Sequence, residues 1–140
     1  MINIVILILI IVRVCKKKLM NLNWHRMDKA EVESRMSEAI EYLKFSVQVY
    51  KMQAREGRHY LHEHPQGATS WQHEDIRELL ESLDAYSVIG HMCCFGMESE
   101  DSLGRGAVFK PTRFMTNCPS ISFALEQKCN GSHSHVRLIN

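Results

Sequence analysis

The chain lacks an excess of charge of either sign. Its 17 Lys and Arg residues stand against 16 Asp and Glu residues, which leaves a net charge of +1 with histidine neutral. Such a balance gives no strong field that would steer the protein onto nucleic acid, so any nucleic-acid contact has to be local. The 140 residues suffice for one domain with a modest core and not for two independent units.

The chain also lacks a regular cysteine pattern. It has five cysteines, an odd number, and Cys93 and Cys94 are adjacent, which is poor geometry for a mutual disulfide. We therefore expect thiols in a reducing, intracellular compartment rather than the disulfide framework of a secreted protein.

No apolar run approaches the roughly 20 residues of a membrane-spanning helix. The longest, Ile4–Val12, is followed by Arg13 and Lys16–Lys18, whereas a secretory signal carries its positive charge ahead of the apolar core. Three interpretations stay open: a strand buried on both faces of a parallel sheet, a membrane anchor, or an artefact of translation. We accordingly treat residues 1–20 as an apolar strand or anchor with a basic linker, and residues 21–140 as the main domain.

Apolar residues at three- and four-residue steps predict a long amphipathic helix from Asp28 to Glu56. Asp28 is placed to cap its start with Glu31 as reciprocal partner, and Gly57 supplies the left-handed residue that ends it. A strand over Arg58–His62 should follow and run parallel to the apolar run, through a right-handed crossover.

Further along, Thr69 and Gln72 form a capping-box pattern that predicts a second helix. Tyr86–Met92 and Pro111–Asn117 are predicted to be strands that pair antiparallel. Between them, Cys93–Phe109 is rich in glycine and acidic residues and is expected to be a long flexible loop.

Pro119 should open a last helix that runs to about Cys129, and the tail Asn130–His135 should be polar and turn-like. The expected fold is α/β, a partial three-layer Rossmann-like sheet in the order strand, helix, strand, helix, strand, strand, helix, with the last two strands antiparallel. Absent sheet strands would leave an open edge, which predicts aggregation or a partner chain that covers it.

Several motifs carry a resemblance that covers roughly Asn21 to Ile139. They are Asn21–Met27, Leu61–Pro65, Phe95–Gly96, Lys110–Asn117 and Cys129–His135. This combination resembles a domain found in polyproteins of retroelements and related mobile elements. That domain in turn resembles the C-terminal half of the catalytic domain of cytosine-5 DNA methyltransferases.

The resemblance implies a truncated, inactive methyltransferase-like domain whose parent would methylate cytosine in nucleic acid with S-adenosylmethionine. Glu63 matches the glutamate that activates the cytosine ring. The cysteine nucleophile should follow a proline, but this sequence departs from that pattern, so the nucleophile is absent or displaced to Cys15. The Gly-rich cofactor loop has no counterpart here, and we expect no cofactor in this chain. The alternative is a non-enzymatic interaction or structural module, membrane-associated through Ile4–Val12.

The strand end at His62, Glu63 and His64 is the first candidate site. Glu63 either acts in an active site or simply hydrogen-bonds the following turn. We expect His62 and His64 to point to opposite faces of the strand, which disfavours a shared metal ion, and we assign them to substrate binding.

Lys110, Thr112 and Arg113 are further candidates for substrate binding. In the resemblance their strand lies near the target base and the phosphate backbone, and Arg113 is suited to contact a phosphate. The alternative is a surface arginine on an edge strand.

Cys129, His133 and His135 carry thiolate and imidazole groups that are sound zinc ligands, with Cys118 as a further candidate. Three ligands at these spacings match no standard zinc finger, so a solvated, turn-forming tail is the competing interpretation.

Overall fold

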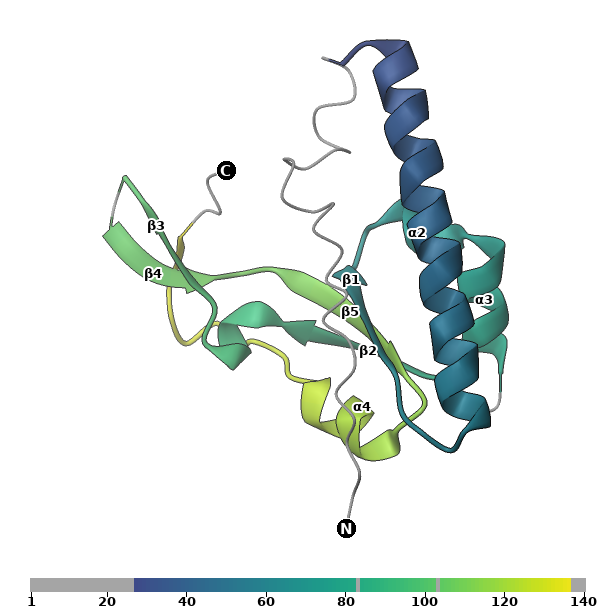
Figure 1. Ribbon diagram of the computed structural model, residues 1–140. Helices are drawn as coiled ribbons and strands as arrows, with labels where there is room; N and C mark the ends of the chain where they lie inside the picture. Colours follow the sequence, from purple (N-terminus) through teal and green to yellow (C-terminus); the bar gives the residue numbers. More distant parts are fainter. Residues whose placement is uncertain (1–26, 83, 103, 137–140) are drawn as a thin grey trace. The chain divides into compact units, whose positions relative to one another are not determined.

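The computed structural model describes residues 27–82, 84–102 and 104–136, and these form a mixed α/β structure (Figure 1). The chain divides into two compact units, Met1–Tyr60 and Leu61–Asn140. The expected strand at Ile4–Val12 and the candidate Cys15 lie outside the described residues. Within the described part, no helix is both long and apolar enough to cross a membrane.

The first unit contains the predicted long helix, α2 (Lys29–Arg55). The Asp28 carboxylate accepts a hydrogen bond from the Ala30 N–H at 3.1 Å, which confirms the predicted N-cap. Glu31, which we expected to complete a capping box, instead forms an ion pair with Arg35 one turn later. Gly57 has a φ of +68° and so takes the left-handed conformation that ends the helix.

Arg58 keeps the chain attached to the helix end, so the next strand begins later than predicted. Its N–H donates to the Gln53 carbonyl at 2.8 Å, and its guanidinium contacts the side chains of Gln53 and Glu56. The strand expected at Arg58–His62 is therefore found at Leu61–Pro65.

The second unit is built on a sheet of three strands, β1 (Leu61–Pro65), β5 (Pro111–Thr116) and β2 (Tyr86–His91), in that order. β5 is antiparallel to both neighbours, which confirms the predicted antiparallel pairing of the last two strands. β1 and β2 therefore run in the same direction. Their carboxyl ends meet the start of β5 along one side of the sheet, which we call the carboxyl edge (Figure 1).

One face of this sheet packs against Trp71, which lies in the short 3-10 helix Thr69–Gln72 ahead of α3 (Glu74–Glu81). The capping pattern at Thr69 does not start α3. His73 caps that helix instead, because its Nδ1 accepts a hydrogen bond from the Asp75 N–H at 3.3 Å. The buried apolar residues of this unit are Trp71, Ile76, Leu79, Val108, Phe114 and Met115.

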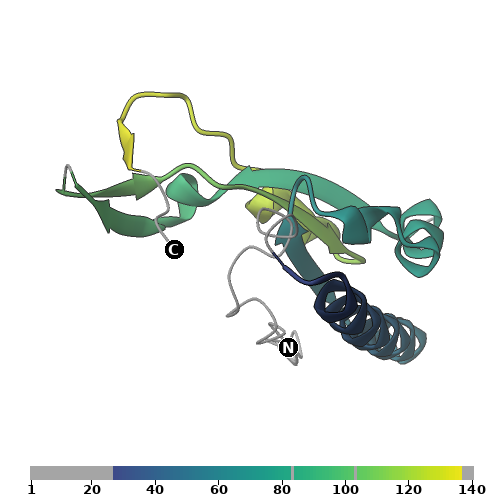
Figure 2. The same ribbon diagram turned by 90° about the horizontal axis from the view of Figure 1, so that it is seen from above.

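The other face carries α4 (Pro119–Leu125), which begins at Pro119 as predicted but ends before Cys129 (Figure 2). Gly90 in β2 permits the close approach of α4. A Cβ atom at this position would lie 2.5 Å from the Leu125 carbonyl oxygen and 2.9 Å from the Phe95 ring.

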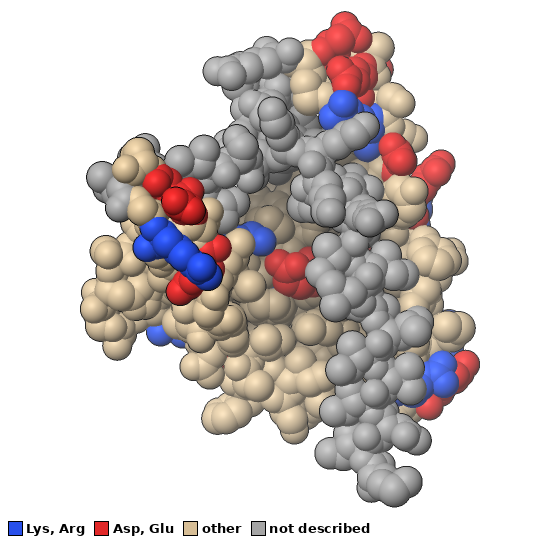
Figure 3. All heavy atoms as spheres, turned by 60° about the vertical axis from the view of Figure 1, so that its left-hand side comes forward, with Lys and Arg blue, Asp and Glu red and all other residues tan. Residues whose placement is uncertain are grey.

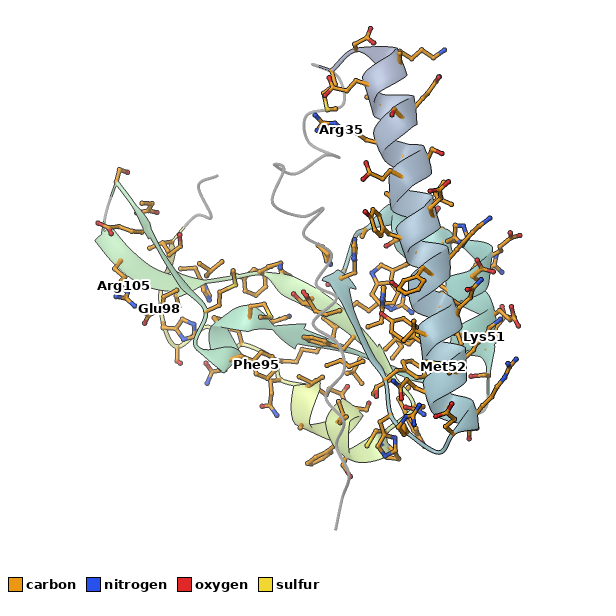
Figure 4. All side chains as sticks on the ribbon, in the orientation of Figure 1. Arg35, Lys51, Met52, Phe95, Glu98 and Arg105 are labelled. Atoms are coloured by element: carbon orange, nitrogen blue, oxygen red, sulfur yellow. The ribbon has the colours of Figure 1, made fainter. Side chains whose placement is uncertain are left out.

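The segment Cys93–Phe109 is not the flexible loop that we predicted. After a short 3-10 helix, Met92–Phe95, it forms a hairpin of β3 (Glu98–Asp101) and β4 (Gly104–Val108). Arg105 and Glu98 lie side by side across this hairpin and form a 2.7 Å ion pair (Figure 4). Pairing between the two strands stabilises a strand conformation that the glycine-rich local sequence does not predict.

The tail is exposed and free of helix or strand up to Ser134, as predicted, but His135 enters a short strand. β6 (His135–Val136) pairs parallel to β4, with His135 opposite Ala107 and Val136 opposite Val108. The second sheet thus has the order β3-β4-β6.

Candidate functional site at the carboxyl edge

The adjacent residues His62, Glu63 and His64 do not form one site. The His62 and His64 rings stack with their centroids 5.9 Å apart and an interplanar angle of 4°. The expectation that they point to opposite faces was wrong, because residues two apart in a strand share a face. Glu63, between them, projects from the other face.

The histidine face is a packed cluster around Trp71. His62 meets the Trp71 ring edge-on at 5.0 Å, and the Arg113 guanidinium carbon lies 4.7 Å from the same ring system. Arg113 Nε also donates to Ser87 Oγ at 2.8 Å. Burial, with a smaller effect of His64, lowers the pKa of His62 to about 4, and burial also lowers the pKa of His64. Both histidines are therefore neutral near pH 7, which suits imidazole rings that are packed against other side chains.

The face that carries Glu63 presents an ion pair. Glu63 Oε1 lies 3.6 Å from Lys110 Nζ, and each side chain keeps about a third of its surface exposed, 34% and 35%. Thr112 is fully buried, and its hydroxyl donates to the Lys110 carbonyl at 3.4 Å. Of the predicted substrate-binding residues, Lys110 thus lies beside Glu63, and Thr112 is buried. Arg113 lies on the face of the sheet opposite Glu63.

A shallow groove lies next to this ion pair. Its lining residues come from the turn after β1 and the segment before β5: Pro65, Gln66, Gly67, Phe109, Lys110 and Pro111. The two walls are tied together by a hydrogen bond from the Gln66 N–H to the Pro111 carbonyl at 3.2 Å. Phe109 is 48% exposed and offers an aromatic surface.

Beside the groove, four side chains converge that we call the Cys/His cluster: Cys93, Cys129, His133 and His135. Their sulfur and ring-nitrogen atoms all lie within 4.8 Å of one another. Cys129 Sγ is 3.7 Å from His133 Nε2 and 3.5 Å from His135 Nε2. Burial, and then the neighbouring Cys129 thiol, raises the pKa of Cys93 to about 11.

The structure therefore brings together the three predicted zinc-ligand candidates, but their neighbour is Cys93 rather than Cys118. The N–H of Cys118 instead donates to Thr116 Oγ1 at 3.2 Å, at the far end of β5 from the carboxyl edge. Cys93 was not among the predicted ligands because its segment, Cys93–Phe109, was expected to be a flexible loop. The signal that could have identified it is its position directly after a strand, ahead of Gly96, which turns the chain at φ +76°.

Phe109 connects the groove to the Cys/His cluster. Its ring lies 5.2 Å from that of His135 and 4.7 Å from that of His91, both in edge-on contact. Phe109 therefore lines the groove and also contacts a residue of the cluster.

Among the described residues, the charged side chains visible on one face are scattered. On the face shown in Figure 3, acidic and basic atoms lie in small groups of mixed sign. Comparison with protein-family models, with curated proteins and with solved structures gives no match for this chain.

Proposed function

We propose that this chain is a methyltransferase-like module of mobile-element origin that binds a cytosine base at the carboxyl edge without methylating it. The observation that carries this proposal is the Glu63–Lys110 pair beside the groove. The resemblance to the methyltransferase family supplies the class of ligand, and the chemistry of the pair fits that class.

Cytosine presents an amino group next to a ring nitrogen and a carbonyl oxygen. A carboxylate accepts a hydrogen bond from the cytosine amino group, and an ammonium group donates to the neighbouring acceptors. Glu63 and Lys110 place such an acceptor and donor next to each other. The exposed Phe109 ring in the groove offers a surface on which a base can stack.

The order of elements also supports the proposal. The strand β1, the helix α3 and the strand β2, which runs in the same direction as β1, are followed after the β3–β4 hairpin by the antiparallel β5 and by α4. In the sheet, β5 lies between β1 and β2. In open α/β sheets, ligands bind beyond the carboxyl ends of the strands, which is where the groove lies. We propose in addition that further strands extend the β1-β5-β2 sheet into a Rossmann-like sheet.

We propose binding rather than catalysis because none of the three prolines in the sequence precedes a cysteine. By the family pattern the nucleophile is therefore absent from this sequence or displaced to Cys15. With S-adenosylmethionine and a cytosine-containing oligonucleotide, we expect the whole chain to transfer no methyl group to the base. Methylated cytosine in a product digest would show that the protein is an active enzyme.

The binding proposal is tested by calorimetry of the whole chain with cytidine and uridine monophosphates. We expect preference for cytidine, because the uracil carbonyl would face the Glu63 carboxylate. Glu63→Gln removes a charged hydrogen bond of about 1.5–3 kcal/mol, so it should reduce cytidine binding by about tenfold or more. Glu98→Gln, which breaks the ion pair on the hairpin, is the matched control and should leave binding unchanged. Equal binding of the two nucleotides would overturn the proposal.

A further inference from the structure

The Cys/His cluster contributes no residue to the lining of the groove, and the cytosine proposal does not account for it. We propose that Cys93, Cys129, His133 and His135 bind one Zn²⁺ ion in a closed, structural site. This inference stands apart from the cytosine proposal, and each can fail without the other.

The spacing of the donor atoms fits tetrahedral zinc. Zinc lies about 2.3 Å from a cysteine sulfur and about 2.0–2.1 Å from a histidine nitrogen, so a tetrahedral angle separates sulfur and nitrogen by about 3.6 Å. Cys129 Sγ lies 3.7 and 3.5 Å from the two histidine nitrogens, and all four donor atoms lie within 4.8 Å of one another. The two Cys129–histidine separations thus match the edge of a zinc tetrahedron.

The donor set also favours zinc over other cations. Two thiols and two imidazoles make the Cys₂His₂ set of many structural zinc sites, and mixed sulfur and nitrogen ligands in a tetrahedron disfavour calcium and magnesium. Because four protein ligands fill the coordination shell, no position remains for a substrate or an activated water.

Hydrogen bonds from backbone groups favour metal binding by Cys129. The Gly131 N–H donates to the Cys129 sulfur at 3.3 Å, which stabilises negative charge on that atom. Gly131 reaches this position with a φ of +74°. The Cys129 N–H donates to His91 Nδ1 at 3.0 Å, and the His91 N–H donates to the Gln127 carbonyl at 2.8 Å. The ligand loop is thereby fastened to the end of β2.

The ion would join segments that are distant in the sequence. Cys93 follows β2, Cys129 follows α4, and His135 lies in β6 against β4. A strand of two residues has little stability of its own, so metal ligation supplies a physical reason for its pairing. Through the contact of His135 with Phe109, the same ion would fix one wall of the groove.

The test uses the whole purified chain, stripped of metal and titrated with Co²⁺ and then Zn²⁺. We expect one equivalent of Co²⁺ to give the intense visible bands of tetrahedral cobalt with thiolate charge transfer, and Zn²⁺ to abolish them. Zinc should also protect Cys93 and Cys129 from alkylation, as mapped by mass spectrometry, while Cys94 and Cys118 stay reactive.

Variants assign the site to these residues. Cys93→Ser removes a ligand and should weaken Co²⁺ binding by more than about 100-fold. This is a larger loss than removal of a residue that only hydrogen-bonds a ligand would cause. Cys94→Ser, at the adjacent position, is the matched control and should bind like the unaltered protein. His133→Cys keeps a suitable donor and should retain binding with stronger thiolate charge transfer, a gain that a misfolded variant cannot mimic.

Three results would overturn the site: no tetrahedral cobalt spectrum at one equivalent, equal loss of binding in Cys93→Ser and Cys94→Ser, or zinc protection of Cys118 instead of Cys129. None of these results bears on the cytosine proposal, since nucleotide binding is measured separately.

Discussion

Gly90 offers the sharpest test of how the second unit is packed. A Cβ atom at this position would lie 2.5 Å from the Leu125 carbonyl oxygen, 2.9 Å from the Phe95 ring and 3.1 Å from the Phe114 ring. Ordinary contacts between carbon and other heavy atoms lie at about 3.5–4.0 Å. Gly90→Ala therefore requires a shift of about 1 Å in a backbone carbonyl or in the sheet.

The cost of this shift should lie at the upper end of the roughly 1–3 kcal/mol that overpacking typically costs, because backbone and two rings crowd the site together. For a unit of this size, each kcal/mol lowers the melting temperature by about 4–8 °C. We thus expect a loss of about 3 kcal/mol and of about 12–24 °C.

The assay is thermal unfolding followed by circular dichroism, with a metal chelator in excess so that no bound ion contributes. Gly67→Ala is the matched control, because no atom lies within 4 Å of the added methyl group. It should leave the melting temperature unchanged or slightly higher. Equal melting temperatures for the two variants would refute the packing of α4 against β2.

Three further outcomes are expected. Trp71→Phe loses the hydrogen bond from Nε1 to the Pro65 carbonyl at 2.9 Å and should cost about 1–2 kcal/mol in urea unfolding; an unchanged midpoint would contradict this. Because burial lowers the pKa of His62 to about 4, stability should be full above the unfolded pKa of about 6.5 and fall by up to about 1.4 kcal/mol per pH unit as the pH drops toward 4. His62→Gln should flatten this decline in chelator-treated protein, and an equally steep decline would exclude His62 as its cause. Zinc at about a hundred times its dissociation constant should add about 2.7 kcal/mol of stability, and the same gain in Cys93→Ser would argue against the metal site.

Local patterns predicted the parts of the fold that depend on neighbouring residues. The apolar periodicity and the Asp28 cap located α2, and Pro119 marked the start of α4. The antiparallel pairing of β2 with β5 was expected because a single connecting segment leads from one strand back to the other. The helix start signals lie within a few residues of the chain, which is why the sequence predicts them.

The hairpin β3–β4 and the short strand β6 were not predictable in this way. The hairpin sequence is rich in glycine and charge and β6 has only two residues, so their strand conformation depends on pairing with a partner rather than on their own propensity. Gly90 is similar, because the close approach of α4 and of the Phe95 and Phe114 rings explains why this position in β2 has no side chain.

The candidate sites show the same division. The available chemical groups could be read from the sequence: a carboxylate at a strand end, a lysine before β5, and a cysteine with two nearby histidines. Which of these groups lie close together depends on how distant segments pack. Strand alternation separates Glu63 from its neighbouring histidines, sheet register brings Lys110 to it, and the return of the tail along β4 brings Cys129, His133 and His135 to Cys93. Ligand geometry depends on contacts between distant segments, which local sequence patterns do not encode.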